Sequence, residues 1–426
     1  MKQKKNKTNR RNFLKAMGAA GLAPYLIRIS AKASAGTGET KNTDPNAAEK
    51  TQKPKIPQMP RRKLGKTGVE VSCLSLGGDF SFIDKQIVLR KAFESGVTYW
   101  DTAHNYGGGN AELGIGKFLT KDPNARKKLF IVSKPAIFWG PITADKVEER
   151  LQTSLKRMNT KYVDLYYAYH GLSDPARLTD EIKQWAKSAK KRKLIRFFGF
   201  STHKNMAACL AAAARLDWID AITTLYNFRV MQDAKMQAAI EACHKAGIGL
   251  TAMKAFSRSV RRLQPVETEQ DKKLLAQFQN RGFTEQQAKI KVVLQDKRFS
   301  AVCVGMQNIS LLTTNIEAVL NKTKLTQSDI EAFKEYARAT CSGYCAGCAY
   351  ICDSALPDTP YISDIMRYLM YYNSYGQQDK ARGLFAQIPA GVRRRLLRTD
   401  YSLAESRCPQ HLPIAKLVAE AVHKLA

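Results

Sequence analysis

Residues 129–170, LFIVSKPAIFWGPITADKVEERLQTSLKRMNTKYVDLYYAYH, form the stretch that decides the fold. Two short apolar runs in it, 129–133 and 163–167, have the length and composition of buried strands. Between them, residues 144–158 carry apolar side chains at three- and four-residue spacing, which is typical of a helix with one buried face. A strand, a helix and a second strand in this order predict two parallel strands joined by a crossover helix.

The same alternation continues outward from this unit in both directions. Short apolar runs predict further strands at 71–76, 97–101, 195–199, 219–225, 248–253 and 301–304, and residues 233–246 repeat the helical spacing. Eight strand-helix units within about 250 residues predict an α/β fold, a (β/α)8 TIM barrel over residues 61–325, with a turn at 62–71 before it. A doubly wound sheet is the alternative. Against it, the first strand-helix turn lacks the G-x-G-x-x-G signature of a Rossmann phosphate loop.

The amino-terminal residues have the features of an export signal over residues 1–35. A strongly basic segment is followed by a weakly apolar stretch, 16–27, that is too short to span a membrane stably. Residues 9–15, NRRNFLK, resemble the twin-arginine export signal. That resemblance implies export of the folded protein to the periplasm or beyond by the twin-arginine translocation machinery. Residues 36–60 predict a flexible linker, and a disordered basic tail is the alternative for the amino terminus.

Composition narrows the class of protein further. The chain has 426 residues, 44% of them hydrophobic, which excludes a disordered, collagen-like or small disulfide-stapled protein. Its 69 Lys and Arg against 37 Asp and Glu give a formal net charge of +32, which favours anionic partners. Basic motifs interleaved with aromatic residues are missing from the sequence, so nucleic acid binding is not expected.

Four ionisable residues follow three neighbouring predicted strands. Asp101 and Tyr106 come at the end of strand 97–101, Lys134 follows strand 129–133, and His170 follows strand 163–167. The carboxyl ends of barrel strands meet at one rim, where barrel enzymes carry their chemistry. A neighbouring ammonium lowers the pKa of a tyrosine, a carboxylate holds that ammonium, and a histidine orients a carbonyl. The set suits proton delivery to a carbonyl oxygen while a hydride arrives at its carbon.

These residues lie within ordered motifs between residues 62 and 319 that resemble the aldo/keto reductase family. The motifs are RRKLGKTGVEVSCLSLGG, YWDTAHNYG, IVSKP, LYYAYH, FFGFSTH, LYNF and AVCVGMQNISLLTTNIEA. The resemblance implies an NAD- or NADP-dependent oxidoreductase acting on a small carbonyl compound or a sugar. It implies that Tyr106 is the proton donor, that Lys134 lowers its pKa, that Asp101 pairs with Lys134, and that His170 orients the carbonyl.

The resemblance also implies cofactor contacts at the rim. Tyr226 is the candidate to stack on the nicotinamide ring, Ser201 and Asn315 resemble the carboxamide and adenine contacts, and Gly305 permits close approach of a phosphate. The sequence departs from the family pattern at Thr202, where Asn is common, and at Thr223, where Gln is common. The loop 305–308 lacks a Lys or Arg to pair with a 2′-phosphate, so the choice between NAD and NADP stays open.

The carboxyl-terminal residues 326–426 predict a small α-helical domain with clustered cysteines. Cys341, Cys345, Cys348 and Cys352 fall within twelve residues, and Cys408 precedes a proline. The spacing resembles a ferredoxin run with one inserted residue. It implies a 4Fe-4S cluster on Cys341, Cys345, Cys348 and Cys408, with Cys352 as the alternative ligand. A zinc site of four thiolates and plain disulfides are the other interpretations.

Three hypotheses about function follow. The leading hypothesis is an exported oxidoreductase of the aldo/keto reductase type. The alternatives are a catalytically retired barrel that serves as a binding or scaffold protein, and an iron-sulfur component of electron transfer. The four rim residues favour the enzyme, because a retired site has no physical need of them.

Overall fold

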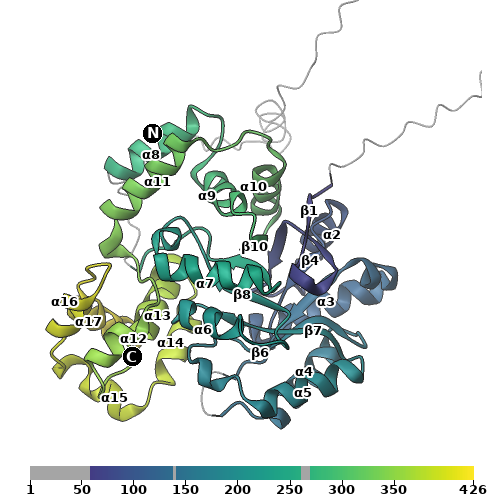
Figure 1. Ribbon diagram of the computed structural model, residues 1–426, viewed down its shortest axis with the longest axis horizontal. Coiled ribbons are helices and arrows are strands. Elements are labelled where there is room, and N and C mark those ends of the chain that lie inside the picture. Colours follow the sequence, from purple (N-terminus) through teal and green to yellow (C-terminus); the bar gives the residue numbers. More distant parts are fainter. Residues whose placement is uncertain (1–57, 138–140, 261–268) are drawn as a thin grey trace, which may run out of the picture. The chain divides into compact units, whose positions relative to one another are not determined.

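Eight parallel strands close into a barrel in the computed structural model, which describes residues 58–137, 141–260 and 269–426 (Figure 1). Around the barrel the strand order is β10, β3, β4, β5, β6, β7, β8, β9. They span Leu74–Gly77 (β3), Tyr99–Asp101 (β4), Phe130–Ser133 (β5), Val163–Tyr169 (β6), Ile195–Thr202 (β7), Ala221–Leu225 (β8), Gly249–Met253 (β9) and Phe299–Gly305 (β10). The predicted TIM barrel is confirmed. The predicted signal 1–35 and all but the last three residues of the linker 36–60 lie outside the described residues.

A hairpin covers the amino-terminal end of the barrel. Its strands Arg61–Lys63 (β1) and Glu70–Ser72 (β2) pair antiparallel. Leu64 from its turn is fully buried, and the amide of Lys66 donates to the carbonyl oxygen of Gly247, just before β9. The predicted strand 71–76 is therefore two strands, β2 and β3, with a break at Cys73.

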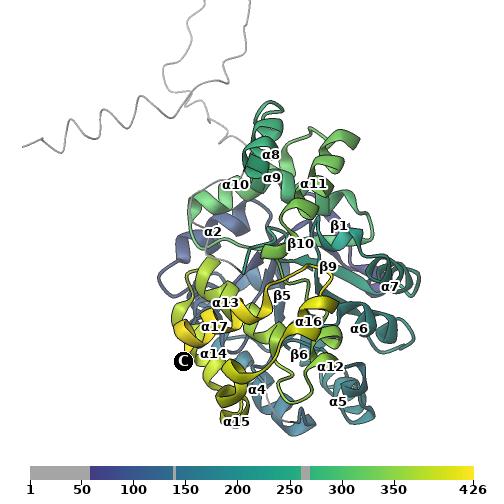
Figure 2. The same cartoon turned by 90° about the vertical axis from the view of Figure 1, so that its left-hand side faces the viewer.

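Helices α2 to α9 connect the barrel strands, and α10 follows the last of them (Figure 2). They span Gln86–Glu94 (α2), Asn110–Lys121 (α3), Ala144–Arg157 (α4), Asp180–Lys191 (α5), Met206–Ala213 (α6), Ala234–Lys245 (α7), Glu269–Gln279 (α8), Glu285–Gln295 (α9) and Ile309–Leu320 (α10). Side-chain caps start several of them: Thr143 accepts the amide of Lys146, and Thr284 and Gln287 form a capping box. The predicted helices 144–158 and 233–246 match α4 and α7.

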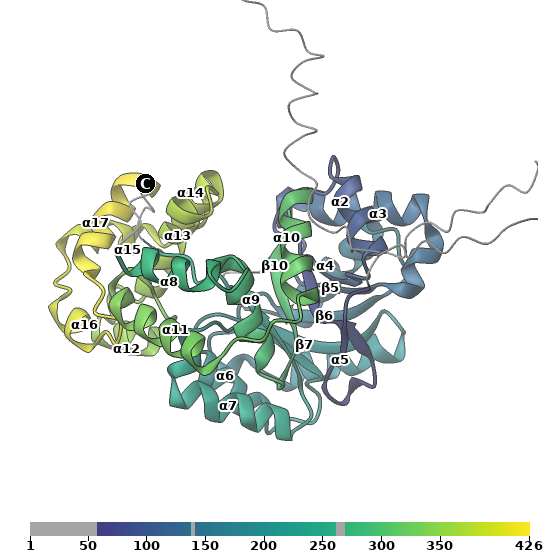
Figure 3. The ribbon, with the colours of Figure 1, turned by 90° about the horizontal axis from the view of Figure 1, so that it is seen from above.

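Helices α11 to α17 form the carboxyl-terminal region. They span Gln327–Ala339 (α11), Ala349–Ala355 (α12), Ile362–Ser374 (α13), Gln378–Ala386 (α14), Ala390–Arg395 (α15), Ser402–Arg407 (α16) and Ile414–Leu425 (α17). Figure 3 shows α13 to α17 gathered together. Side chains of α13, α14 and α17 share a core of their own, whereas Phe333 of α11 stacks on Phe228 after β8, 4.9 Å between ring centroids. Helix α11 thus packs with the barrel, although the sequence predicted that the helical domain begins at residue 326.

No helix in the described ranges combines the length and the apolar character needed to cross a bilayer.

Gly199 offers a test of the barrel itself. It pairs with Ala221 between β7 and β8, and a Cβ at Gly199 would lie 1.8 Å from the Ala221 carbonyl oxygen. We expect Gly199→Ala to lower the free energy of unfolding by about 3 kcal/mol, because the strands must separate to admit the methyl group. The matched control is Gly383→Ala in α14, where a Cβ meets nothing within 4 Å and alanine favours the helix by about 0.5–1 kcal/mol. Urea denaturation of both variants measures the difference, and equal stability would contradict the strand pairing.

Candidate active site

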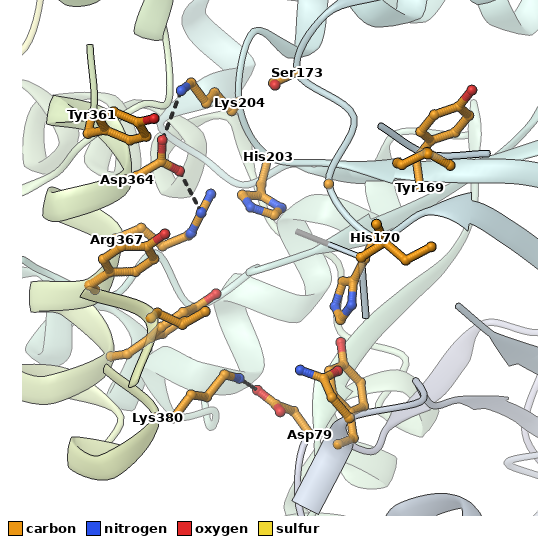
Figure 4. A pocket seen from close by; sticks show the side chains of 18 of the residues that line it. Asp79, Tyr169, His170, Ser173, His203, Lys204, Tyr361, Asp364, Arg367 and Lys380 are labelled. Atoms are coloured by element: carbon orange, nitrogen blue, oxygen red, sulfur yellow. Dashed lines mark hydrogen bonds and ion pairs between the residues drawn. The ribbon is translucent and has the colours of Figure 1, made fainter. Parts of the chain in front are cut away.

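A cavity of about 320 Å³ lies at the carboxyl ends of the barrel strands. Asp79 after β3, Tyr106 after β4 and His170 after β6 line it from the barrel side. Arg367 of α13 and Lys380 of α14 line it from the helical region, so the two parts of the chain enclose the site together (Figure 4). The volume suits a small ligand.

A buried ion pair lies beside this cavity. The Lys134 ammonium is 2.7 Å from an Asp101 carboxylate oxygen and 2.8 Å from the Thr102 carbonyl oxygen, to both of which it donates. Lys134 is 3% exposed and Asp101 7% exposed, so neither charge is screened by solvent. Burial raises the pKa of the Asp101 carboxyl, and the Lys134 ammonium opposes that change. The pairing that the sequence predicted is present in the structure.

Tyr106 is held as a neutral phenol. Burial raises its pKa well above the ordinary value near 10, and the Asp101 carboxylate adds to the effect. The Lys134 nitrogen lies 5.0 Å from the centroid of the Tyr106 ring. Removal from water dominates the net shift, and the lowering of this pKa by Lys134 stays a prediction. A proton donor needs its proton, and this environment keeps it in place.

His170 faces Tyr106 and is held neutral. The two rings meet edge to face with 5.4 Å between their centroids. Burial lowers the pKa of His170 well below its ordinary value, and the cations Lys134, Lys380 and Arg367 lower it further. A neutral imidazole presents one N–H donor, which is what orienting a carbonyl oxygen requires.

Of the four residues predicted to contact the cofactor, three have surroundings that are compatible with a bound dinucleotide. Ser201 is buried and donates to the carbonyl oxygen of His170, 2.8 Å away, so it lies next to the site. A Cβ added at Gly305 would meet nothing within 4 Å, which leaves room for a phosphate. Both amide atoms of Asn315 are buried and have no hydrogen-bond partner in the structure. Unpaired buried polar atoms are rare, and a dinucleotide would satisfy these.

Tyr226 is not available for stacking. Its ring is 1% exposed and stacks on Phe299, 4.3 Å between centroids, and its hydroxyl donates to Asp296 at 2.7 Å. The prediction that Tyr226 stacks on a nicotinamide is wrong, because the side chain packs between the barrel and its helices. The side chain of Thr223 also has a partner inside the barrel, since its hydroxyl shares a hydrogen bond of 2.8 Å with the hydroxyl of Tyr167.

The cysteines group differently from the sequence prediction. Cys345, Cys348, Cys352 and Cys408 line one small cavity of about 20 Å³, and Cys341 is not among its lining residues. All nine cysteines of the chain are free thiols in the structure. Burial raises the pKa of Cys345, Cys348 and Cys352. Within the described residues, no cluster of three or more His, Cys, Asp or Glu side chains is close enough to hold a metal ion as it stands.

Sequence reasoning missed the wall of the cavity that comes from the helical region. Arg367 and Tyr371 lie four residues apart on α13 and face the cavity together with Lys380. Asp364, one turn from Arg367, accepts hydrogen bonds from both Arg367 and Lys204 (Figure 4). The i, i+4 spacing of Arg367 and Tyr371 was the only available signal, and it is equally typical of a solvated helix face.

A parallel barrel with a tyrosine, a histidine and a lysine–carboxylate pair at its carboxyl rim defines an oxidoreductase of the α/β-barrel class. The sequence profile of the aldo/keto reductase family matches residues 74–338, more than half of the chain. The chain therefore belongs to the aldo/keto reductase family, whose members are NAD(P)H-dependent oxidoreductases.

Two solved structures are similar to this chain. The chain is 26% identical to the thermostable aldo-keto reductase Tm1743, solved in complex with the inhibitor epalrestat; the match covers 65% of this chain and 100% of that one, with a TM-score of 0.53. It shares the fold of the aldo-keto reductase AKR11C1 from Bacillus halodurans, solved in its holo form, at 20% identity and a TM-score of 0.54 over 66% of this chain and 96% of that one.

Proposed function

We propose that the protein transfers a hydride between NAD(P) and the carbonyl or hydroxyl carbon of a small polar compound, such as a sugar. The observation that supports this most directly is the convergence of Tyr106 and His170 on one cavity beside the buried Lys134–Asp101 pair. Ser201, Gly305 and Asn315 fit a dinucleotide at the rim through an adjacent hydroxyl, open space and an unpaired amide. When bound, the nicotinamide supplies or accepts the hydride.

The residues of the chain would act on the substrate oxygen. His170 donates a hydrogen bond to the carbonyl oxygen and thereby positions its carbon. As negative charge develops on that oxygen, the Tyr106 hydroxyl gives up its proton to it. The transfer is favourable because an alkoxide is a stronger base than a phenolate, even when the pKa of the phenol is raised. The Lys134 ammonium then lies near the new phenolate and stabilises it, while Asp101 keeps Lys134 charged and in place.

The lining of the cavity favours a hydroxyl-rich substrate. Tyr361, Tyr368 and Tyr371 offer aromatic faces, and Asp364 and Arg367 offer hydrogen-bonding groups beside them. Aromatic rings with a polar edge suit a ligand that has both C–H faces and hydroxyl groups. This combination supports a sugar over a purely apolar carbonyl compound.

The proposed hydride transfer can be tested directly by following the transfer of deuterium from the cofactor to the substrate. Purified protein is incubated with NADH or NADPH deuterated at nicotinamide carbon 4 and with a panel of aldoses, ketoses and simple aldehydes. We expect mass spectrometry to find one deuterium on the former carbonyl carbon of at least one substrate, and the two cofactors compared separately report the preference. Protein that binds the sugars but transfers no deuterium with either cofactor would support the scaffold hypothesis instead.

We further propose that the folded, cofactor-loaded protein is exported by the twin-arginine machinery, on the basis of residues 9–15 alone. Replacing Arg10 and Arg11 by lysine should retain the protein in the cytoplasm, and fractionation of the producing cells measures this. Equal export of the variant would contradict the proposal.

A metal centre on the four thiols that share a cavity is a separate proposal. Four thiolates are the ligand set of a 4Fe-4S cluster or of structural zinc, and the cavity as it stands has room for little more than a single ion. The set supported is Cys345, Cys348, Cys352 and Cys408, with Cys352 in place of the predicted Cys341.

We expect anaerobically isolated protein to contain bound metal, and Cys352→Ser to lose most of it. Cys341→Ser is the matched control and should retain the full content. Elemental analysis and acid-labile sulfide distinguish four iron with four sulfide from one zinc per chain. Loss of metal in Cys341→Ser with retention in Cys352→Ser would restore the ligand set predicted from the sequence, and absence of metal from all variants would exclude the centre.

A further inference from the structure

Helix α13 presents a second tyrosine to the cavity that holds Tyr106 and His170. Tyr371 lines this cavity from the helical region and is half-buried. Beyond the aromatic face that it offers to the substrate, nothing above gives its hydroxyl a role. Its surroundings differ sharply from those of Tyr106.

Two lysines from different elements hold Tyr371. The Lys254 nitrogen donates to the Tyr371 hydroxyl at 3.4 Å and lies 4.8 Å from the ring centroid. Lys254 follows β9 directly, with a φ of 59°. A non-glycine residue in this left-handed region carries backbone strain, which concentrates at functional sites. Lys380 belongs to α14, and its nitrogen lies 4.8 Å from the centroid of the same Tyr371 ring.

Lys380 also links the two tyrosines. Its nitrogen lies 5.8 Å from the centroid of the Tyr106 ring and pairs with the Asp79 carboxylate. Both phenol rings are therefore neighbours of one ammonium group at the wall of one cavity. Both side chains line the cavity in which a substrate of a few carbon atoms would lie.

The pKa values of the two phenols are shifted in opposite directions. Burial raises the pKa of Tyr106 well above its ordinary value. Burial also acts to raise the pKa of Tyr371, but Lys254, Lys380 and Arg367 together outweigh it, so this pKa lies below the ordinary value. The charged and titratable groups around Tyr371 from all packed elements are Lys254, Arg367, Lys380, Asp79, Tyr106, Tyr368 and Tyr375. Two titratable groups whose pKa values are driven apart by their environments are the mark of an acid and a base in one site.

We propose that Tyr371 is a second catalytic residue, a base that removes a proton from the carbon next to the substrate carbonyl; this rests on the proposed function, which places that carbonyl at Tyr106 and His170. The C–H electron pair becomes a C=C bond, and the carbonyl π pair moves onto the oxygen. Tyr106 and His170 stabilise that oxygen by hydrogen bonds. Return of the proton from the Tyr371 hydroxyl restores the carbonyl compound, so no oxidant or reductant is consumed.

The substrate class follows from this step. The compound must carry a hydrogen on the carbon adjacent to the carbonyl, as every keto form of a sugar does. Such a site can exchange the hydrogen on that carbon, invert the configuration of that carbon, or shift the position of the carbonyl group. It does so in addition to transferring a hydride. The helical region would then add a reaction to the barrel rather than only enclose it.

The test measures proton exchange separately from reduction. Dihydroxyacetone is incubated in D2O with wild-type protein and oxidised NAD(P), so that no hydride is available, and proton NMR follows loss of the CH2 signals. We expect exchange well above the enzyme-free rate, and a fall of about 10²-fold or more in Tyr371→Phe. Tyr372→Phe is the matched control, because Tyr372 contacts Arg382 and Lys424 and does not line the cavity. It should exchange at the wild-type rate.

A second readout needs no substrate. Ultraviolet difference titration at the tyrosinate band should show one tyrosine that ionises below the others in wild-type protein and is missing from Tyr371→Phe. Lys254→Met removes the cation that favours the phenolate, so this ionisation and the pH dependence of exchange should both move upward. Reduction without exchange by wild-type protein, or identical titration curves for wild type and Tyr371→Phe, would overturn the proposal. Exchange without reduction would overturn only the proposed hydride transfer.

Discussion

Tyr106→Phe should lower the rate of carbonyl reduction by about 10²–10⁴-fold while leaving the affinity for NAD(P) nearly unchanged. The variant keeps the ring and its edge-to-face contact with His170 and loses only the hydroxyl. That hydroxyl acts when negative charge develops on the substrate oxygen, so the loss should fall on kcat rather than on cofactor binding. Steady-state kinetics and fluorescence titration with the dinucleotide measure the two effects.

The matched control is Tyr162→Phe, since Tyr162 precedes β6 at the opposite end of the barrel, where its ring packs under Arg126. It should turn over substrate at the wild-type rate. If Tyr106→Phe also retained wild-type turnover, the proton would have to come from elsewhere, and the assignment of Tyr106 would be wrong.

Lys134→Met should lower both stability and activity. The variant leaves the Asp101 carboxyl buried without its 2.7 Å partner, and removing one member of a buried pair typically costs about 3–5 kcal/mol. Activity should fall by about 10²-fold or more, because the variant loses the ammonium that lies 5.0 Å from the Tyr106 ring and stabilises its phenolate. Urea denaturation and kinetics at a temperature where the variant is folded measure the two losses separately.

The double variant Asp101→Asn with Lys134→Met separates structure from chemistry. The double variant contains no buried charge without a partner, so much of the lost free energy of unfolding should be recovered. The activity should not, since the cation is still missing. Recovery of both together would mean that the pair serves only the fold. Lys117→Met, at an exposed lysine of α3, controls for loss of a positive charge as such.

Local patterns were sufficient to predict most of the barrel. The strand predicted at 219–225 and the helix predicted at 144–158 are β8 and α4 with their ends moved by one or two residues. These elements are bounded by turn residues and carry one clear periodicity, so nearby residues define them. The strand predicted at 71–76 was misread because an apolar run is the same in a hairpin and in a barrel. Only the partner decides, and β2 pairs with β1 while β3 pairs with β4 and β10.

The catalytic candidates were predictable and the cofactor candidates less so. Asp101, Lys134 and His170 lie at or just after strand ends, and a barrel brings all strand ends to one rim. Tyr226 also follows a strand, but its side chain turned outward to Phe299 and Asp296. The direction of a single side chain beyond a strand end depends on which neighbours offer it a partner, and those neighbours are about 70 residues away in the chain.

The sequence by itself determined the barrel, the family and the rim positions of Asp101, Tyr106, Lys134 and His170, because strand and helix periodicity and the order of motifs are properties of neighbouring residues. The tertiary structure alone decided which cysteines share a cavity and which helices complete the active site. Cys408 meets Cys345 and Cys348 only because the chain returns after five intervening helices, α12 to α16. Tyr371 meets Lys254 across 117 positions of sequence. Such contacts depend on how α13 and α14 pack over the rim, and side-chain packing between distant segments leaves no local pattern in the sequence.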